Sequence, residues 1–168
     1  MPLHPQDIPA LAVGFIAYRE GYSPVPTDKV DGYSTVGYGH LIAYRPVTAE
    51  DRQARWVPNQ LTPGRLTRSE AMTLLRTDLR STAAEVRHLV KVPTNRRQFS
   101  MLVSFAFNVG TGALASSTLL RRLNAGDYAC VPSELMRWIN GPNGQLPGLV
   151  IRRRREGYRF RPLHRPRG

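Results

Sequence analysis

The chain has 168 residues, of which 41% are hydrophobic and 21% charged, and Lys and Arg outnumber Asp and Glu by 24 to 12. This length and composition are typical of one folded domain and exclude a disordered tail. The net charge of +12 predicts an acidic partner such as nucleic acid, anionic lipid or an acidic wall polymer, although a general bias toward arginine would give the same charge. A single cysteine, Cys130, excludes an intramolecular disulfide, and with four scattered histidines we predict no metal site.

The N-terminal segment predicts a helix that ends at Gly21. Asp7 can cap it, and apolar residues recur at helical spacing from Ile8 to Ile16. Glu20 falls on the border of this apolar stripe, which suits a half-buried carboxyl. The segment has no basic start or cleavage site of a signal peptide, and its apolar stretch is too short to span a bilayer. We therefore expect synthesis in a cytoplasm without a Sec-type export signal.

The next stretch predicts a hairpin or a three-stranded antiparallel sheet over roughly residues 26–46. It combines prolines and glycines with alternating Thr, Val and Tyr, a pattern that disfavours a helix. Asp31-Gly32 is a dipeptide favoured in tight hairpin turns. Residues 47–65 predict a loop with room for one helical turn.

Helical patterns return from Thr67, where Thr67 and Glu70 form a capping box and Pro93 ends the segment. Residues 96–109 are apolar nearly all round, so we expect a buried central helix there. Further helices are predicted at 117–125, at 132–139 and from Pro147 onward. The fold class is therefore α+β, in a single domain over 1–168, with the small sheet in about 21–46 and a mainly helical lobe in about 66–168.

Hydrolysis of a glycosidic bond needs two carboxyls that face each other across the sugar. One carboxyl donates a proton from an apolar setting, where desolvation keeps it protonated, and the other stays ionised. Glu20 suits the first role, although a solvated residue at a helix end would have the same position. Asp28 and Asp31 are candidates for the second; the turn explains Asp31, so we favour Asp28. Thr35, on the returning strand, could hydrogen-bond a water held by the aspartate.

The stretch REGYSPVPTDKVDGYSTVGYGH resembles the active-site segment of the T4-type phage lysozymes, the muramidase endolysins. Their pattern is Glu, eight residues, Asp or Cys, five residues, Thr, and a Gly-Tyr-Gly-His-like tail. Glu20 and Thr35 keep the family's separation, and residues 37–40 match the tail. Lys29 occupies the aspartate position, so the hairpin entry must shift or bulge to present Asp28. Segments 66–79, 98–128 and 135–160 also resemble family segments, in the family's order.

The resemblance implies a lysozyme-like fold and further site residues. It implies that Glu20 is the catalytic acid, that Tyr38 and Arg152 contact substrate, and that Arg152 or its neighbour Arg153 lies near Glu20. It also implies a structural pair between His40 and Asp78. If Asp28 orients water, the carboxyls should be about 6.5–9.5 Å apart and the reaction inverting, whereas about 5 Å would imply a retaining, covalent route.

The expected function is that of a phage or prophage endolysin, a monomer that hydrolyses the β-1,4 bond between N-acetylmuramic acid and N-acetylglucosamine without a cofactor. It would wait in the host cytoplasm and then act on the peptidoglycan of the periplasm or cell wall. Anionic outer-membrane lipid is a further candidate partner for the arginines at 152–155, which a solvated helix face would explain equally well; nucleic acid is not expected. The alternatives are an inactive lysozyme-like wall-binding protein and a cationic membrane-active protein.

Overall fold

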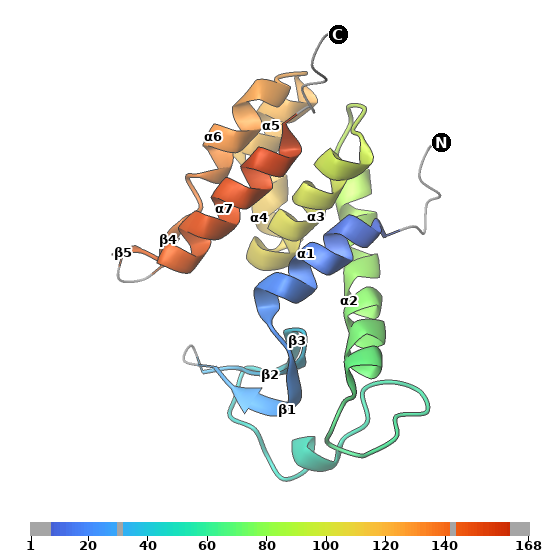
Figure 1. Ribbon diagram of the computed structural model, residues 1–168. Helices are drawn as coiled ribbons and strands as arrows, with labels where there is room; N and C mark the ends of the chain where they lie inside the picture. The colour runs from blue at the N-terminus through green and yellow to red at the C-terminus, as the bar shows by residue number, and fades with distance from the viewer. Residues whose placement is uncertain (1–7, 30–31, 142–143, 162–168) are drawn as a thin grey trace, which may run out of the picture. The chain divides into compact units, whose positions relative to one another are not determined.

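The computed structural model describes residues 8–29, 32–141 and 144–161. The chain divides into two compact units, Val13–Ser81 and a second unit of Met1–Ala12 with Thr82–Gly168. The predicted α+β class is confirmed: the helices are α1 (Ala10–Glu20), α2 (Arg68–Leu89), α3 (Arg96–Val109), α4 (Thr111–Ala115), α5 (Thr118–Asn124), α6 (Val131–Leu135) and α7 (Pro147–Phe160), and the strands are β1 (Ser23–Asp28), β2 (Ser34–Gly37), β3 (His40–Ala43), β4 (Asn140–Gly141) and β5 (Gly144–Gln145) (Figure 1). The predicted single catalytic domain stays a prediction.

The unit Val13–Ser81 contains the antiparallel sheet, in the order β1-β2-β3. It follows directly on α1, which ends as predicted: Gly21 adopts φ +71, and its N–H donates to the carbonyl of Ala17 at 3.2 Å. A side chain at this backbone conformation would be strained, so glycine sets the end of the helix. The predicted capping residue Asp7 and the turn residue Asp31 lie outside the described residues.

Strand β1 contains the irregularity that the sequence predicted at the hairpin entry. Ser23 pairs with Gly37 but Thr27 pairs with Thr35, so four residue steps on β1 match two on β2. The prolines of β1 explain this, because a proline has no N–H to donate to a neighbouring strand. The hydroxyls of Ser23 and Thr27 instead donate to the carbonyl of Val25, at 2.7 and 3.1 Å. The bulge sets the register with which Asp28 reaches the end of the strand.

The loop between β3 and α2 is held by polar side chains that bind backbone groups. It contains one 3-10 turn, η1 (Asp51–Gln53), as the sequence allowed. The amide of Gln60, 3% exposed, accepts from the N–H of Trp56 at 2.7 Å and donates to the carbonyl of Thr62 at 2.8 Å. Glu70 of α2 then closes the loop, because its carboxylate accepts a hydrogen bond from a loop N–H.

Glu70 confirms the predicted capping box at the start of α2. Its carboxylate accepts from the Thr67 N–H at 2.7 Å, and the Thr67 hydroxyl accepts from the Glu70 N–H at 3.2 Å. The second carboxylate oxygen accepts from the Leu61 N–H, also at 2.7 Å. These bonds lower the pKa of Glu70 from its usual value, with the Thr67 N–H the largest cause and the Leu61 N–H the next. One carboxylate thus caps the helix and anchors the loop.

The unit of Met1–Ala12 with Thr82–Gly168 is built around α3, which has the predicted bounds and is buried over residues 98–106. Asn95 and Gln98 form a capping box at its start, and α7 packs against both α3 and α6 (Figure 1). Ser117 caps α5 as predicted. The helix predicted at 132–139 is shorter, ending at Leu135, and α4, β4 and β5 were not predicted. No helix in the described part of the chain is long and apolar enough to cross a membrane.

Candidate active site

Glu20, the predicted acid, lies at the end of α1 and is half-buried. Its carboxyl is beside the turn between β2 and β3, where Gly39 adopts φ +80. A Cβ atom built on Gly39 would lie 3.3 Å from both Cγ and Oε2 of Glu20. Glycine is therefore required here for two reasons: a backbone that L residues rarely adopt, and a carboxyl packed against its Cα. The sequence motif contained this glycine, but the contact with Glu20 could not be predicted from it.

Asp28 is the last residue of β1 and is exposed. One oxygen of its carboxylate, Oδ1, accepts a hydrogen bond from the backbone N–H of Val47 at 2.7 Å. The Val47 N–H lies 19 residues further along the chain, just after the sheet, and no sequence motif pointed to it. This bond fixes the direction of the carboxylate.

The predicted Thr35 and a neighbour that the sequence did not single out lie in β2. Thr35 is 4% exposed and pairs with Thr27 across the hairpin. Ser34 pairs with Asp28, is fully buried, and its hydroxyl has no hydrogen-bond partner among the described residues. Ser34 is therefore a cross-strand neighbour of Asp28, although Ser34 is buried and Asp28 is exposed. A buried polar group without a partner marks a position where function is a reasonable explanation.

Tyr38, predicted to contact substrate, is 9% exposed in the β2–β3 turn. Its ring lies 5.5 Å from the ring of Tyr22 with an interplanar angle of 43°. Tyr22 is itself fixed, because its hydroxyl donates to the carbonyl of Leu66 at 2.6 Å and the guanidinium of Arg68 lies 4.5 Å from its ring centre. This arrangement accounts for Tyr38 as a packing residue, and its contact with substrate stays a prediction.

His40 and Asp78 form the predicted pair. Nδ1 of His40 lies 2.9 Å from Oδ2 and 3.1 Å from Oδ1 of Asp78, so β3 is tied to α2. Both side chains are partly exposed, at 27% and 22%. The contact holds the end of the Gly37–His40 motif in place, which agrees with the structural role that the sequence predicted.

Arg152 and Arg153 belong to a buried ionic cluster in the unit that contains α3 and α7. Nε of Arg152 donates to Glu156 at 3.2 Å, and its Nη2 donates to the carbonyl of Ser104 at the same distance. Arg153, fully buried, also binds Glu156. The interpretation of residues 152–155 as a solvated helix face is therefore wrong for these two, while Arg154 and Arg155 are exposed. A role for Arg152 in binding substrate stays a prediction.

A model of the family described as phage lysozyme matches residues 17–156. An endolysin of Bacillus phage B103 is 39% identical over 137 residues, which are 82% of this chain and 45% of that protein. A SAR-endolysin of Escherichia phage Mu is 33% identical over 138 residues, covering 82% of this chain and 71% of that protein. The chain spans only about half the length of the endolysins of Bacillus phages B103 and PZA, 45% and 46%.

Solved structures agree with the sequence matches. The muramidase domain of SpmX from Asticaccaulis excentricus superposes with a TM-score of 0.75 at 32% identity, covering 92% of this chain and 97% of that one. A variant of P22 lysozyme superposes with a TM-score of 0.74 at 27% identity, with the same coverage. Because the family model covers most of the chain, including Glu20, Asp28 and Thr35, the chain belongs to the phage lysozyme family.

Proposed function

We propose that this chain is an endolysin that hydrolyses the β-1,4 bond between N-acetylmuramic acid and N-acetylglucosamine in peptidoglycan. The observation that supports this best is the position of Glu20, whose carboxyl packs against Gly39 in the motif typical of the family. Family membership and the likeness to a muramidase domain support the same reaction class. The substrate is the wall polymer. The protein acts on it as a monomer after release from the host cytoplasm.

In the proposed mechanism Glu20 is the general acid and protonates the oxygen of the leaving sugar. The carboxylate of Asp28, held by the Val47 N–H, accepts a proton from the attacking water, so that the water adds to the anomeric carbon as the glycosidic bond breaks. Thr35, on the neighbouring strand β2, helps to position that water.

The test is the release of reducing sugar ends from purified peptidoglycan by the wild-type chain and Glu20→Gln. We expect the substitution to lower the rate by about 10²–10⁴-fold, the usual contribution of a general acid. Glu85→Gln, at an exposed position of α2, is the matched control and should retain the wild-type rate. Wild-type activity in Glu20→Gln would contradict the assignment, and no activity in the wild-type chain would contradict the function.

A further inference from the structure

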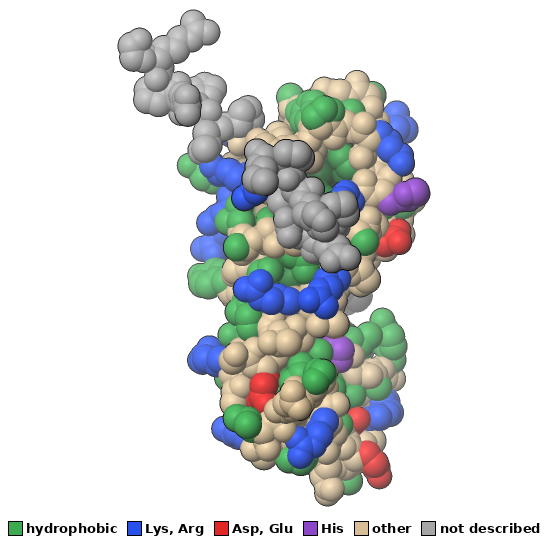
Figure 2. Space-filling view, turned by 90° about the vertical axis from the view of Figure 1, so that its right-hand side faces the viewer, with side chains coloured by type: hydrophobic (Ala, Val, Ile, Leu, Met, Phe, Trp, Pro, Cys, Tyr) green, Lys and Arg blue, Asp and Glu red, His purple; other side chains and the backbone are tan. Residues whose placement is uncertain are grey.

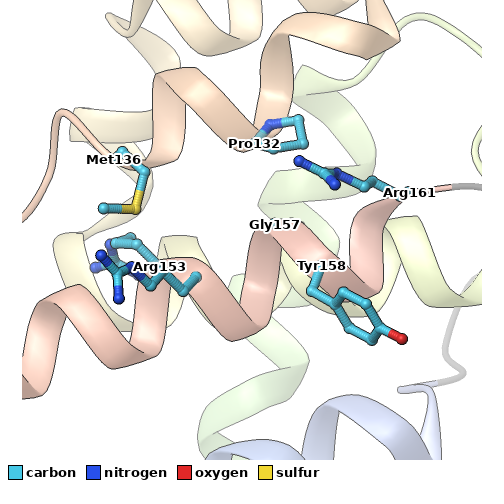
Figure 3. Close-up of a pocket in the computed structure, with 7 residues that line it drawn as sticks. Pro132, Met136, Arg153, Gly157, Tyr158 and Arg161 are labelled. Atoms are coloured by element: carbon cyan, nitrogen blue, oxygen red, sulfur yellow. The ribbon is translucent and has the colours of Figure 1, made fainter.

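A cationic pocket lies between α6 and α7, in the unit that does not contain Glu20 or Asp28. Its volume is about 260 Å³, and its lining residues are Pro132, Met136, Arg153, Arg154, Gly157, Tyr158 and Arg161. None of these seven is acidic. Figure 3 shows the side chain of Met136, which follows the last residue of α6, pointing toward Arg153, and the guanidinium of Arg161 reaching toward Pro132. The pocket therefore combines positive charge with an apolar wall.

The helices approach closely at the floor of this pocket because Gly157 has no side chain. A Cβ atom built there would lie 3.1 Å from both Cα and Cβ of Pro132. The charge of Arg153, which also lines the pocket, is already offset, since its guanidinium binds Glu156, Asn108 and the carbonyl of Trp138. Arg153 is thus a wall of the pocket and not its anion-binding group.

Arg154 and Arg161 supply the available charge. Both are exposed, and neither has a carboxylate partner among the described residues. The nearby Glu134 of α6 is occupied, because it binds Arg122 at 3.2 Å and lies 3.9 Å from Arg137. An anion that enters the pocket would therefore meet two guanidinium groups with no competing carboxylate in the lining, an arrangement that suits a phosphate group.

The exposed face of α7 adds an apolar component to this charge. Ile151, Arg154, Arg155 and Tyr158 follow each other at helical spacing, and Ile151 and Tyr158 are 47% and 72% exposed. Leu146, just before the helix, is 45% exposed. Figure 2 shows the opposite side of the molecule, the right-hand side of Figure 1, where blue Lys and Arg side chains also exceed red Asp and Glu side chains, so positive charge is not confined to α7. Nucleic acid or an acidic wall polymer would require the charge but not the exposed Ile and Leu, whereas a lipid surface requires both.

We propose that the α6–α7 pocket binds the phosphate headgroup of an anionic phospholipid, with the exposed face of α7 lying on the membrane surface. Arg154 and Arg161 bind the phosphate oxygens, Met136 and Pro132 contact the glycerol region, and Ile151 and Tyr158 enter the interface beside it. Tyrosine favours this interface because its ring is apolar and its hydroxyl remains hydrated. The binding is independent of the proposed hydrolysis, since it uses none of its residues.

The test measures binding of the full chain to vesicles of phosphatidylcholine alone and of an equal mixture with phosphatidylglycerol. Since each arginine near an anionic surface contributes about fivefold, Arg154→Gln with Arg161→Gln should weaken binding to the mixed vesicles about 30-fold. The matched control is Arg76→Gln with Arg80→Gln, two exposed arginines of α2 that lower the net charge equally. The control should bind within a few-fold of wild type.

An equal loss of vesicle binding in both double variants would overturn the proposed pocket site, because binding would then depend on net charge alone. If the wild type bound vesicles of phosphatidylcholine alone as tightly as the mixed vesicles, the proposed requirement for an anionic lipid would be wrong. Release by millimolar inorganic phosphate, with no loss in Ile151→Ser/Tyr158→Ser, would indicate a soluble phosphate site and overturn the lipid proposal. Tighter binding to wall teichoic acid or DNA than to the vesicles would do the same. Release of reducing ends from purified peptidoglycan should be unchanged in every variant, so a failure of this proposal is distinguishable from a failure of the proposed function.

Discussion

The two units of this chain use their carboxylates differently. In Val13–Ser81, with 9 basic and 7 acidic residues and a net charge of +2, the carboxylates of Asp28, Asp51 and Glu70 each accept a backbone N–H from a loop. In the remainder, with 15 basic and 5 acidic residues and a net charge of +10, Glu134 and Glu156 bind arginines. In the first unit these carboxylates thus hold loops through backbone N–H groups, with Asp51 also bound to Arg45, and in the helical unit Glu134 and Glu156 neutralise buried or crowded guanidinium groups.

The largest effect on stability should come from the helical unit. Glu156→Gln removes the carboxylate that both Arg152 and Arg153 bind in the interior. Removing one partner of a buried ion pair typically lowers the free energy of unfolding by about 3–5 kcal/mol, because charge remains in the interior without compensation. Chemical denaturation should detect this loss. The exposed Glu85→Gln of α2 should change stability by no more than about 0.5 kcal/mol, and a similar small change in Glu156→Gln would refute the role of the cluster.

The second largest effect should be on activity, and it concerns Asp28, one of the carboxylates that bind a loop N–H. Asp28→Asn keeps an oxygen that can accept the Val47 N–H but removes the proton acceptor. We expect peptidoglycan hydrolysis to fall about hundredfold, with little change in melting temperature. Asp31→Asn, the other candidate, should retain most of the activity. If Asp31→Asn is the more damaging of the two, the second carboxylate has been assigned to the wrong residue.

Substitution of Gly39 should lower the hydrolysis rate by a smaller factor, because the backbone conformation at this position determines how Glu20 packs. Gly39→Ala forces a side chain into φ +80, at a cost of about 1–2 kcal/mol, and its Cβ would push on the carboxyl of Glu20 at 3.3 Å. We expect the hydrolysis rate to fall about tenfold, as small misplacements of reacting groups do. Gly14→Ala in α1 is the control: it meets no atom within 4 Å and should stabilise the chain by about 1 kcal/mol without changing the rate.

The elements that the sequence predicted well are those with local signals. The capping box of Thr67 and Glu70 and the apolar pattern of 96–109 each involve residues within a few turns of each other, and both helices begin where predicted. The two-residue strands β4 and β5 are too short to leave a periodic pattern. The short helix α4 follows α3 across Gly110, which the sequence indicated only as the end of α3.

The candidate site was predictable in its residue types but not in its contacts. A motif match identified Glu20 and the irregular hairpin entry, and it implied the His40–Asp78 pair. The bond from Val47 to Asp28 joins residues 19 positions apart through a loop with no regular structure, so no spacing rule could predict it. Arginine at four successive positions of α7 gave no sign of which side chains are buried; the buried face followed only from the packing of α7 on α3 and α6.

The smallest effect should be the response of the loop to acid. The pKa values of Asp51 and Glu70 are lowered, for Asp51 chiefly by Arg45 and then by the Thr48 N–H, and for Glu70 chiefly by the Thr67 N–H. Because the folded pKa of Glu70 lies below its ordinary value of 4.5, its ionised form stabilises the fold fully above that pH. This stabilisation is lost as the pH falls from the ordinary pKa through the lowered one.

Glu70→Gln should therefore lower the melting temperature at pH 7 but have progressively less effect below pH 4.5, where the wild type loses the same charge. Melting curves of both chains at pH 7, 5, 4 and 3 measure this convergence. Thr67→Val is the companion variant, since it removes the hydroxyl of the capping box but leaves the backbone N–H that Glu70 binds. It should be less stable than wild type at every pH, and a gap between wild type and Glu70→Gln that stayed constant down to pH 3 would mean that the charge of Glu70 does not hold the loop.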